Sequence, residues 1–376
     1  MLRRTGILLR FLAMAAILSM PLKLALAGTE TAIVIGHAID LSGPNGSIGR
    51  DYVAGITTYF DSVNVKGGIN GRQVRYLVRD DHGEPAESVR LVGELIKQDH
   101  AAYLLGGIGV EVTRAIVASP AFENSDLVLF APLSDSLNIA RARAMFWRPS
   151  LEQELQFILS YFERLGIKDV GIAYQESPLN HDAYRSVVSQ LRRRGMTLSG
   201  TAKLASSPAE LEKEAANLSR KRPAMVIAIA DTISTALFLK AFRKHEPVVF
   251  VAGTSLINLA TLAEIAGSKA TEWAVFSQVV PDPASSSSAI QSEHIAMMKK
   301  FRDEPVSSIT LEGFAVGKTL SKAIQMDRSS RGRLQQFVAH KSAIDLGGLT
   351  VSSSGQQKNM SEYVNIALFK KGGLLY

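Results

Sequence analysis

Short apolar segments alternate with amphipathic helical patterns along nearly the whole chain, and this alternation constrains the fold more than any other feature. A strand, a helix and a further strand in this order form parallel sheets that helices cover on both faces, joined by right-handed crossovers. The sequence therefore predicts an α/β protein with parallel sheets. The segments with the length and composition of buried strands are 33–38, 74–79, 102–106, 127–131, 169–174, 224–230 and 248–252.

Two successive units of this pattern occupy residues 28–149 and 150–280. Pro149 marks the point between them, because proline interrupts regular structure and the hydroxyl of Ser150 can cap the next helix. A capping box with proline at the first helical position is predicted at residues 207–210. After removal of a 27-residue leader the chain has 349 residues, more than one core usually holds, so we expect two domains.

Two further breaks follow in the last quarter of the chain, at 281–288 and at 346–359. The segment between them carries helical patterns at 291–301 and 309–325. A last strand is predicted at 364–370. Together with the break at Pro149, the sequence therefore contains three interruptions of regular structure.

The first 27 residues have the pattern of a secretion signal. Three arginines precede an apolar core at 11–20, and an Ala-Leu-Ala cleavage site ends at Ala27. The apolar core is too short and too early to favour a membrane span, although an uncleaved N-terminal anchor remains the alternative. We therefore expect cleavage after Ala27 and a mature protein in an exported compartment.

The basic charge of the chain belongs partly to this leader. The formal net charge is +7, and the leader holds four basic and no acidic residues, so its removal leaves 38 basic against 35 acidic residues, or +3. Basic runs at 192–194 and 220–222 lie near the ends of predicted helices, where they complement the helix dipole and face water. The composition therefore does not imply a nucleic-acid partner.

The residue inventory argues against an enzyme. The chain has no cysteine, which excludes a thiol nucleophile, a disulfide frame, a cysteine metal site and a lipoprotein anchor. The seven histidines are scattered and form no metal-ligand spacing, and no nucleophile elbow or P-loop lysine is present. The glycines at 106, 107 and 109 lack the third glycine of a dinucleotide fingerprint, with Thr113 near its place. We expect neither a cofactor nor a metal, and a Rossmann-type enzyme is disfavoured.

One stretch of the first unit carries a family resemblance. Residues 63–85 read as a helix end, a glycine turn at Gly67 and Gly68, an alternating strand, and an acidic loop at Asp80 and Asp81. With the Leu-Ser-Gly-Pro sequence at 41–44, this string resembles the leucine/isoleucine/valine-binding protein family. Members of this family are periplasmic receptors of ABC importers with the type I binding-protein fold.

The resemblance implies how the units are connected. It implies two Rossmann-like lobes whose parallel sheets are joined by three hinge crossings, a number that matches the three breaks. Lobe 1 would comprise residues 28–149 and 282–350, and lobe 2 residues 150–281 and 351–376. The implied function is an extracytoplasmic receptor, expected to be monomeric, that captures a small polar metabolite between the lobes and delivers it to an ABC permease in the inner membrane.

Loops at the carboxyl ends of the predicted strands are the candidate site, because ligands of open parallel sheets bind there. By the resemblance, a serine and a threonine that hold the ligand carboxylate in relatives correspond to Val110 and Asp135, and Ser134 keeps a hydroxyl. A tyrosine and an ammonium-binding acid of the second lobe correspond to Leu179 or Asn180 and to Thr254 or Ser255. The candidate ligand-binding residues are Ser42, Asn45, Val110, Glu111, Thr113, Leu133, Ser134, Asp135, Leu179, Asn180, Asp231, Thr254 and Ser255.

These substitutions alter the amino-acid clamp and leave alternatives open. Glu111 and Asp135 would repel a carboxylate unless they turn away or are protonated. Asp231 is a candidate for the missing acid, and the three acids favour a ligand with a cationic or amide-like donor. Helix capping is the structural alternative for Ser134 and Asp135. A ligand sensor that reports to a membrane signalling protein is the alternative to an importer, because both use the same fold.

Overall fold

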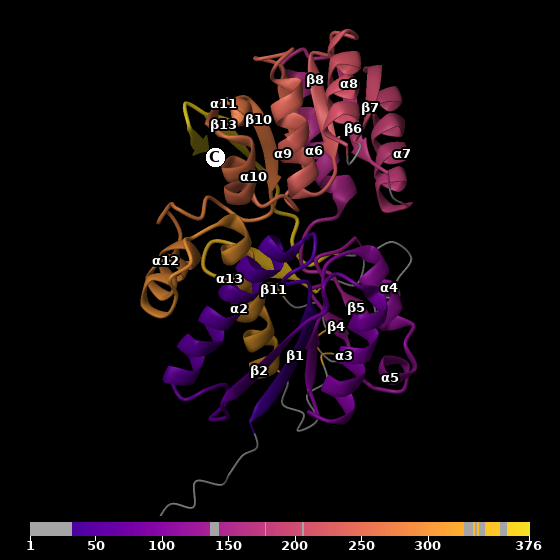
Figure 1. The fold of residues 1–376 in the computed structure, drawn as a ribbon. Helices are drawn as coiled ribbons and strands as arrows, with labels where there is room; N and C mark the ends of the chain where they lie inside the picture. Colours follow the sequence, from indigo (N-terminus) through magenta and orange to yellow (C-terminus); the bar gives the residue numbers. More distant parts are fainter. Residues whose placement is uncertain are drawn as a thin grey trace, which may run out of the picture. The chain divides into compact units, whose positions relative to one another are not determined.

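The structure is a computed structural model, and it describes residues 32–135, 143–176, 178–204, 207–326, 334, 337, 343–353 and 359–376. The predicted secretion signal at 1–27 lies outside these residues. The compact unit that begins at Ile33 contains two parallel β-sheets, each covered by helices on both faces (Figure 1).

The first sheet has the strand order β2-β1-β3-β4-β5, and all neighbouring pairs are parallel. Four of these strands were predicted, and β5 was missed because it is only two residues long. Before β2, Gly67 and Gly68 have φ values of 98° and 84°, as predicted for the end of a helix. The strands are β1 (Ile33–Ile39), β2 (Val74–Asp80), β3 (Tyr103–Leu105), β4 (Leu129–Phe130) and β5 (Ala144–Met145).

The two-residue period of β1 divides its side chains between two layers of helices. Ile35 and Ile39 pack in the cluster formed with α2 and α13, whereas Ala38 packs in the cluster formed with α3 and α4. These helices and one short helix lie on opposite faces of the sheet (Figure 1). They are α2 (Gly46–Val65), α3 (Pro85–Lys97), α4 (Val110–Val117), α5 (Pro120–Glu123) and α13 (Ser308–Met326).

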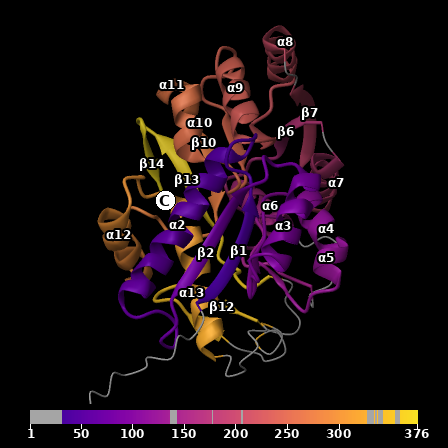
Figure 2. The ribbon, with the colours of Figure 1, turned by 60° about the horizontal axis from the view of Figure 1, so that its bottom comes forward.

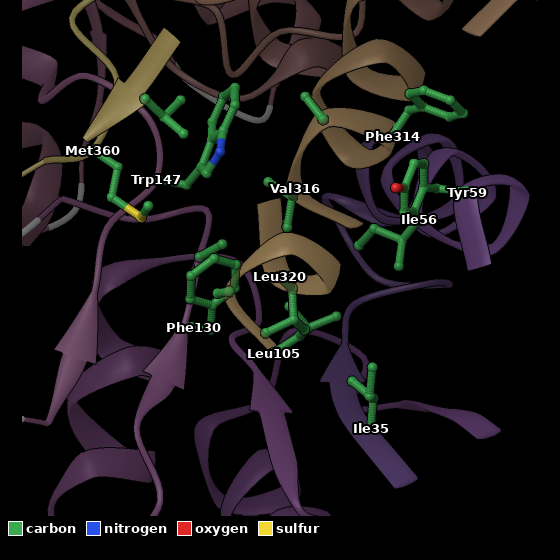
Figure 3. Close-up of a cluster of buried hydrophobic side chains, with 14 of the residues drawn as sticks. Ile35, Ile56, Tyr59, Leu105, Phe130, Trp147, Phe314, Val316, Leu320 and Met360 are labelled. Atoms are coloured by element: carbon green, nitrogen blue, oxygen red, sulfur yellow. The ribbon is translucent and has the colours of Figure 1, made fainter. Parts of the chain in front are cut away.

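Helices α2 and α13 are far apart in the sequence but pack closely together. Figure 3 shows Ile56 and Tyr59 of α2 opposite Phe314 and Val316 of α13, above the strand residue Leu105. The rings of Tyr59 and Phe314 meet edge to face with centroids 5.1 Å apart. Helix α12 (Ala289–Phe301) lies beside α2 (Figure 1, Figure 2).

The second sheet has the order β14-β13-β10-β9-β8-β6-β7. Strands β7, β6, β8, β9 and β10 are parallel, and β13 and β14 add an antiparallel edge. The prediction of parallel α/β sheets is therefore confirmed. The strands are β6 (Asp169–Gln175), β7 (Thr197–Leu204), β8 (Met225–Ile229), β9 (Phe250–Gly253), β10 (Ala274–Gln278), β13 (Asn365–Lys370) and β14 (Gly373–Leu375).

Two hydrophobic clusters cover the faces of this second sheet. One is formed with α6 and α7, and the other with α8, α9 and α10. A short helix, α11 (Ser268–Thr271), leads from α10 to β10. The longer helices are α6 (Leu151–Arg164), α7 (Pro178–Arg193), α8 (Pro208–Ser219), α9 (Thr232–Phe242) and α10 (Leu259–Ala266).

Two predicted helix starts differ in their capping. At α6, the Ser150 hydroxyl accepts the N–H of Gln153 and the Gln153 side chain accepts the N–H of Ser150, which is a complete capping box. At α8, Pro208 takes the first helical position as predicted, but the Ser207 side chain makes no cap hydrogen bond, so the predicted capping box is wrong. Residues 207–210 are exposed, so water can accept hydrogen bonds from the backbone amides that a capping side chain would otherwise bind.

The chain passes between the sheets after β5, after β10 and before β13. The third passage lies later than expected. Val351 and Met360 belong to the hydrophobic cluster of the first sheet, and the N–H groups of Met360 and Ser361 donate to the carbonyls of Phe146 and Trp147. The predicted boundary at 350 thus falls inside a segment that still packs on the first sheet and that includes β11 (Ala343–Asp345) and β12 (Thr350–Ser352).

Candidate ligand-binding site

A cavity of about 360 Å³ lies beyond the carboxyl ends of strands from both sheets. Its walls come from the loops after β1, β3 and β4 of the first sheet and after β6, β8 and β9 of the second, together with the start of α6. This is the position at which open parallel sheets bind ligands. The lining residues are Pro44, Asn45, Ile108, Gly109, Val110, Leu133, Ser134, Asp135, Arg148, Pro149, Leu151, Glu154, Leu155, Gln175, Glu176, Asn180, Ala183, Ala228, Ile229, Ala230, Asp231, Thr254 and Leu256.

The structure brings most of the candidate residues together at this cavity. They come from six separate loops, so their proximity follows from the fold and not from sequence spacing. The candidate residues that line the cavity are Asn45, Val110, Leu133, Ser134, Asp135, Asn180, Asp231 and Thr254.

Other candidate residues are outside the lining. Glu111 lies in the first turn of α4 with its side chain 58% exposed, 3.7 Å from Arg114. Ser42 is 2.7 Å from a ring nitrogen of His82, and the Thr113 hydroxyl donates to the carbonyl of Gly109. Ser255 is buried behind the cavity wall. The side chain of Leu179 is outside the described part of the structure.

The position of Glu111 changes the electrostatic interpretation. A charge in water on the outer side of α4 does not repel a ligand inside the cavity as a facing carboxylate would. The acids that line the cavity are Asp135, Glu154, Glu176 and Asp231.

Asp231 both lines the cavity and caps a helix. Its carboxylate accepts the N–H of Ser234 at 2.7 Å and the Ser234 hydroxyl at 3.1 Å, which fixes the start of α9. On the neighbouring loop, the side-chain amide of Asn180 donates to the carbonyl of Gln175 at 2.8 Å. The Asp231 side chain therefore caps α9 and at the same time belongs to the cavity lining.

A buried charged cluster that we did not predict adjoins the cavity. Arg148, Glu154 and Glu312 have side-chain exposures of 3%, 3% and 1%. Nη2 of Arg148 donates to the Ser255 hydroxyl and lies 4.0 Å from Glu154, and Nε lies 3.6 Å from Glu312. Arg148 and Glu154 line the cavity, whereas Glu312 lies behind them on α13.

The two carboxylates of this cluster are held differently. Glu154 accepts the N–H of Ser255 at 2.8 Å and the hydroxyl of Ser277 at 2.6 Å. Burial raises the pKa of Glu312, the Arg148 charge lowers it, and the Glu154 charge raises it further. Within the described part of the chain, Oε2 of Glu312 and Nε and Nη1 of Arg148 have no hydrogen-bond partner.

One sequence signal could have identified this cluster. Arg148 is a lone charge between the aromatic pair at 146 and 147 and the proline of the predicted crossing. A charge at such a junction is a candidate for burial where elements converge, but its glutamate partners come from helices far apart in the sequence.

No helix among the described residues has both the length and the apolar character needed to cross a membrane.

Comparison with known proteins places these features in a family. Residues 32–333 match the periplasmic binding protein family, so the match covers well over half of the chain. The fold and the family are those of solute-binding receptors, not of enzymes. The chain belongs to the periplasmic binding protein family, and the resemblance to leucine/isoleucine/valine-binding proteins is confirmed.

Individual relatives are distant. An amino acid binding protein of Pseudomonas aeruginosa is 31% identical over 100 residues, a match that spans 27% of this chain and 26% of that protein. An extracellular ligand-binding receptor from Verminephrobacter eiseniae superposes with a TM-score of 0.83 at 19% identity, over 92% of this chain and all of that one. A branched-chain amino acid transporter substrate-binding protein from Streptococcus pneumoniae, in complex with isoleucine, gives 0.79 at 15% identity, over 92% and 98%.

Proposed function

We propose that this protein is an extracytoplasmic solute-binding receptor of an ABC importer. It captures an amino acid or a related small polar metabolite, such as an amide or an amine, and presents it to a permease in the inner membrane. The observation that carries the proposal is the cavity built from strand-end loops of both sheets. A sensor that feeds a membrane signalling protein would use the same cavity, and the receiving membrane protein distinguishes the two.

Binding would be coupled to movement about the three passages between the sheets. A ligand that contacts loops of both sheets favours the arrangement in which they are close, because only differential contact shifts such an equilibrium. The proposed lobes are those expected from the sequence, 28–149 with 282–350 and 150–281 with 351–376, except that the third passage falls after residue 361.

The location of the receptor is a further part of the proposal. We propose export to the periplasm, cleavage after Ala27, and a monomeric mature protein. Mass spectrometry of the periplasmic fraction should find Gly28 as the first residue. A membrane-bound form with an intact N-terminus would contradict this part.

A thermal-shift screen over amino acids, amides, polyamines and aromatic acids tests the binding function. A compound at 100 times its dissociation constant should add about 2.7 kcal/mol to the free energy of unfolding. Each positive compound is then measured by calorimetry on Thr254→Trp, which places a large ring in the cavity, and on Thr201→Trp, a matched change on the exposed strand β7. Loss of binding in Thr254→Trp alone supports the site. Equal binding in both variants would place the site elsewhere.

A further inference from the structure

Arg148 belongs to the cavity lining, and one nitrogen of its guanidinium group, Nη1, is buried without a hydrogen-bond partner among the described residues. We propose that Arg148 determines ligand specificity, and that its Nη1 donates a hydrogen bond to the carbonyl oxygen of a carboxamide ligand. The inference rests on the proposed function, since it names the ligand class of the same cavity.

The hydrogen-bond inventory of Arg148 leaves this nitrogen available. Nη2 donates to the Ser255 hydroxyl, and Nε is 3.6 Å from Glu312. Nη1 has no partner among the residues that the structure describes, although the whole side chain is only 3% exposed. A buried donor without an acceptor is costly, so a ligand group that reaches this nitrogen and supplies an acceptor gains binding free energy.

The position of Arg148 is fixed before any ligand arrives. The Asn359 side chain donates to the Arg148 carbonyl at 2.5 Å, and the next two residues are Pro149 and the capping residue Ser150. The guanidinium is also held between carboxylates of two different helices, Glu154 of α6 and Glu312 of α13. A donor with so little freedom loses little entropy when it binds, which favours selective recognition.

The surrounding charges decide which acceptor fits. Arg148, the one arginine that the described residues contribute to the lining, already has two carboxylates within 4.0 Å, and three further acids line the cavity. A ligand carboxylate would add a negative charge to this group, whereas an amide oxygen accepts the same hydrogen bond without a charge. The NH₂ of a carboxamide can also donate toward the acidic lining, which a carboxylate cannot do. The carboxamide therefore matches both the free donor and the excess of acids.

Matched pairs of probes test this inference on the intact mature protein. Isovaleramide with isovalerate, and benzamide with benzoate, differ only in the group that meets Arg148. Calorimetry should show each amide binding at least 10-fold more tightly than its acid. Equal affinities, or tighter binding of the acids, would overturn the inference.

Three variants separate an effect of charge on ligand selectivity from an effect on folding. Glu312→Gln removes a negative charge behind Arg148 at a position outside the lining, so it should narrow the ratio of amide to acid affinity several-fold, whereas Glu264→Gln on an exposed face of α10 should not. Arg148→Met combined with Glu312→Gln removes the donor but leaves the net charge of the three-residue cluster at −1, since one positive and two negative groups become one negative group, and it should weaken the binding of both amides at least 10-fold. An unchanged ratio in the folded Glu312→Gln protein would contradict the charge argument, even where the double variant does not fold.

The failure of this inference is distinguishable from that of the proposed function. If the thermal-shift screen finds a ligand but neither amide binds, the carboxamide assignment is overturned and the receptor function stands. If no compound of any class binds, the proposed function itself is contradicted.

Discussion

His37 is a buried histidine whose hydrogen bonds define its protonation state. Nε2 lies 2.9 Å from the carbonyl of Gly106, which can only accept, so Nε2 carries the hydrogen. Nδ1 lies 2.5 Å from the Tyr76 hydroxyl and accepts from it. Burial lowers the pKa of His37 from 6.5 to about 4, although the bond to Gly106 acts in the opposite direction. The neutral ring is therefore a structural part of the first sheet.

This lowered pKa predicts acid sensitivity. Because the folded pKa lies below the unfolded one, the contribution of His37 is complete above pH 6.5 and is lost as the pH falls toward 4. The full difference corresponds to about 3 kcal/mol, or about 1.4 kcal/mol per pH unit within this window. In urea unfolding at pH 7, 6 and 5, His37→Gln should show a flatter dependence of stability on pH than the parent. His294, whose pKa burial also lowers to about 4, should keep part of the slope in both proteins.

Asp231 offers a way to separate binding from capping. Asparagine is as good an N-cap as aspartate, so Asp231→Asn should keep the melting temperature but weaken the binding of a cationic ligand about 10-fold. Asp231→Ala should lower both the affinity and the stability, the latter by about 1 kcal/mol. Glu111→Gln is the matched control, because Glu111 lies outside the cavity. Calorimetry and thermal unfolding measure both effects, and an unchanged affinity in Asp231→Asn would leave Asp231 with a capping role only.

At the scale of elements, the contact between α2 and α13 depends on two glycines. A Cβ on Gly55 would lie 2.0 Å from the carbonyl oxygen of Thr310, and one on Gly313 would lie 2.1 Å from that of Tyr52. Gly55→Ala should therefore destabilise the protein by about 1–3 kcal/mol despite the better helix propensity of alanine. Gly93→Ala in α3 is the control, because its Cβ would meet only ordinary contact at 3.8 Å, and it should stabilise by up to about 1 kcal/mol. Equal effects of the two changes in urea unfolding would contradict this packing.

The two helix starts predict a contrast in stability. Ser150→Ala removes the hydroxyl that accepts the N–H of Gln153 in the capping box of α6 and should cost about 1 kcal/mol. Ser207→Ala at the start of α8 should cost much less, because that side chain makes no cap hydrogen bond. Thermal unfolding of the two single variants measures the difference. A similar loss in both would show that Ser207 caps its helix in solution.

The local chemistry of a strand or helix decides whether it could be predicted from the sequence. Strands such as β1 and β8 are continuous apolar runs that any parallel sheet would bury, and their sequence alone indicates them. Strand β7 was missed because its outer residues are polar and half exposed, as suits an edge. The third passage was placed too early because pairing of residues 359–361 with the segment after β5 depends on long-range contacts.

The site was predictable in part for a similar reason. Strand ends in a parallel fold converge, so the loops that hold Asn45, Ser134 and Asp231 could be named before their geometry was known. The direction in which a side chain points from a loop or a first helical turn could not be predicted from the sequence. Glu111 was expected in the site, but its side chain points to solvent. The cluster around Arg148 was missed because the burial of a charge depends on partners from distant helices.

At the scale of the whole molecule, a hydrogen-bonded contact joins a helix that covers the first sheet to a helix that covers the second. This contact lies away from the three passages between the sheets. Asn258, the N-cap of α10, donates its side-chain amide to Asp51 at 3.1 Å and to the carbonyl of Ser47 at 3.3 Å, both on α2. The Ser307 hydroxyl donates to the same Asp51 oxygen at 2.9 Å. Burial raises the pKa of Asp51, while these two side-chain hydrogen bonds lower it. The contact links a helix of the second sheet to a helix of the first.

We expect this contact to favour the ligand-binding arrangement of the two sheets. Asn258→Asp keeps a good N-cap for α10 but sets a second carboxylate against Asp51, which turns an attractive contact into a repulsive one. The ligand-binding arrangement of the two sheets then becomes less populated, and the apparent affinity for the ligand falls by the same fraction. X-ray scattering should give a larger radius of gyration for the unliganded variant, and calorimetry a weaker affinity for any compound found in the screen. Asn124→Asp, an exposed position at the end of α5, should change neither quantity. If Asn258→Asp also changes neither, the contact does not control the arrangement of the two sheets.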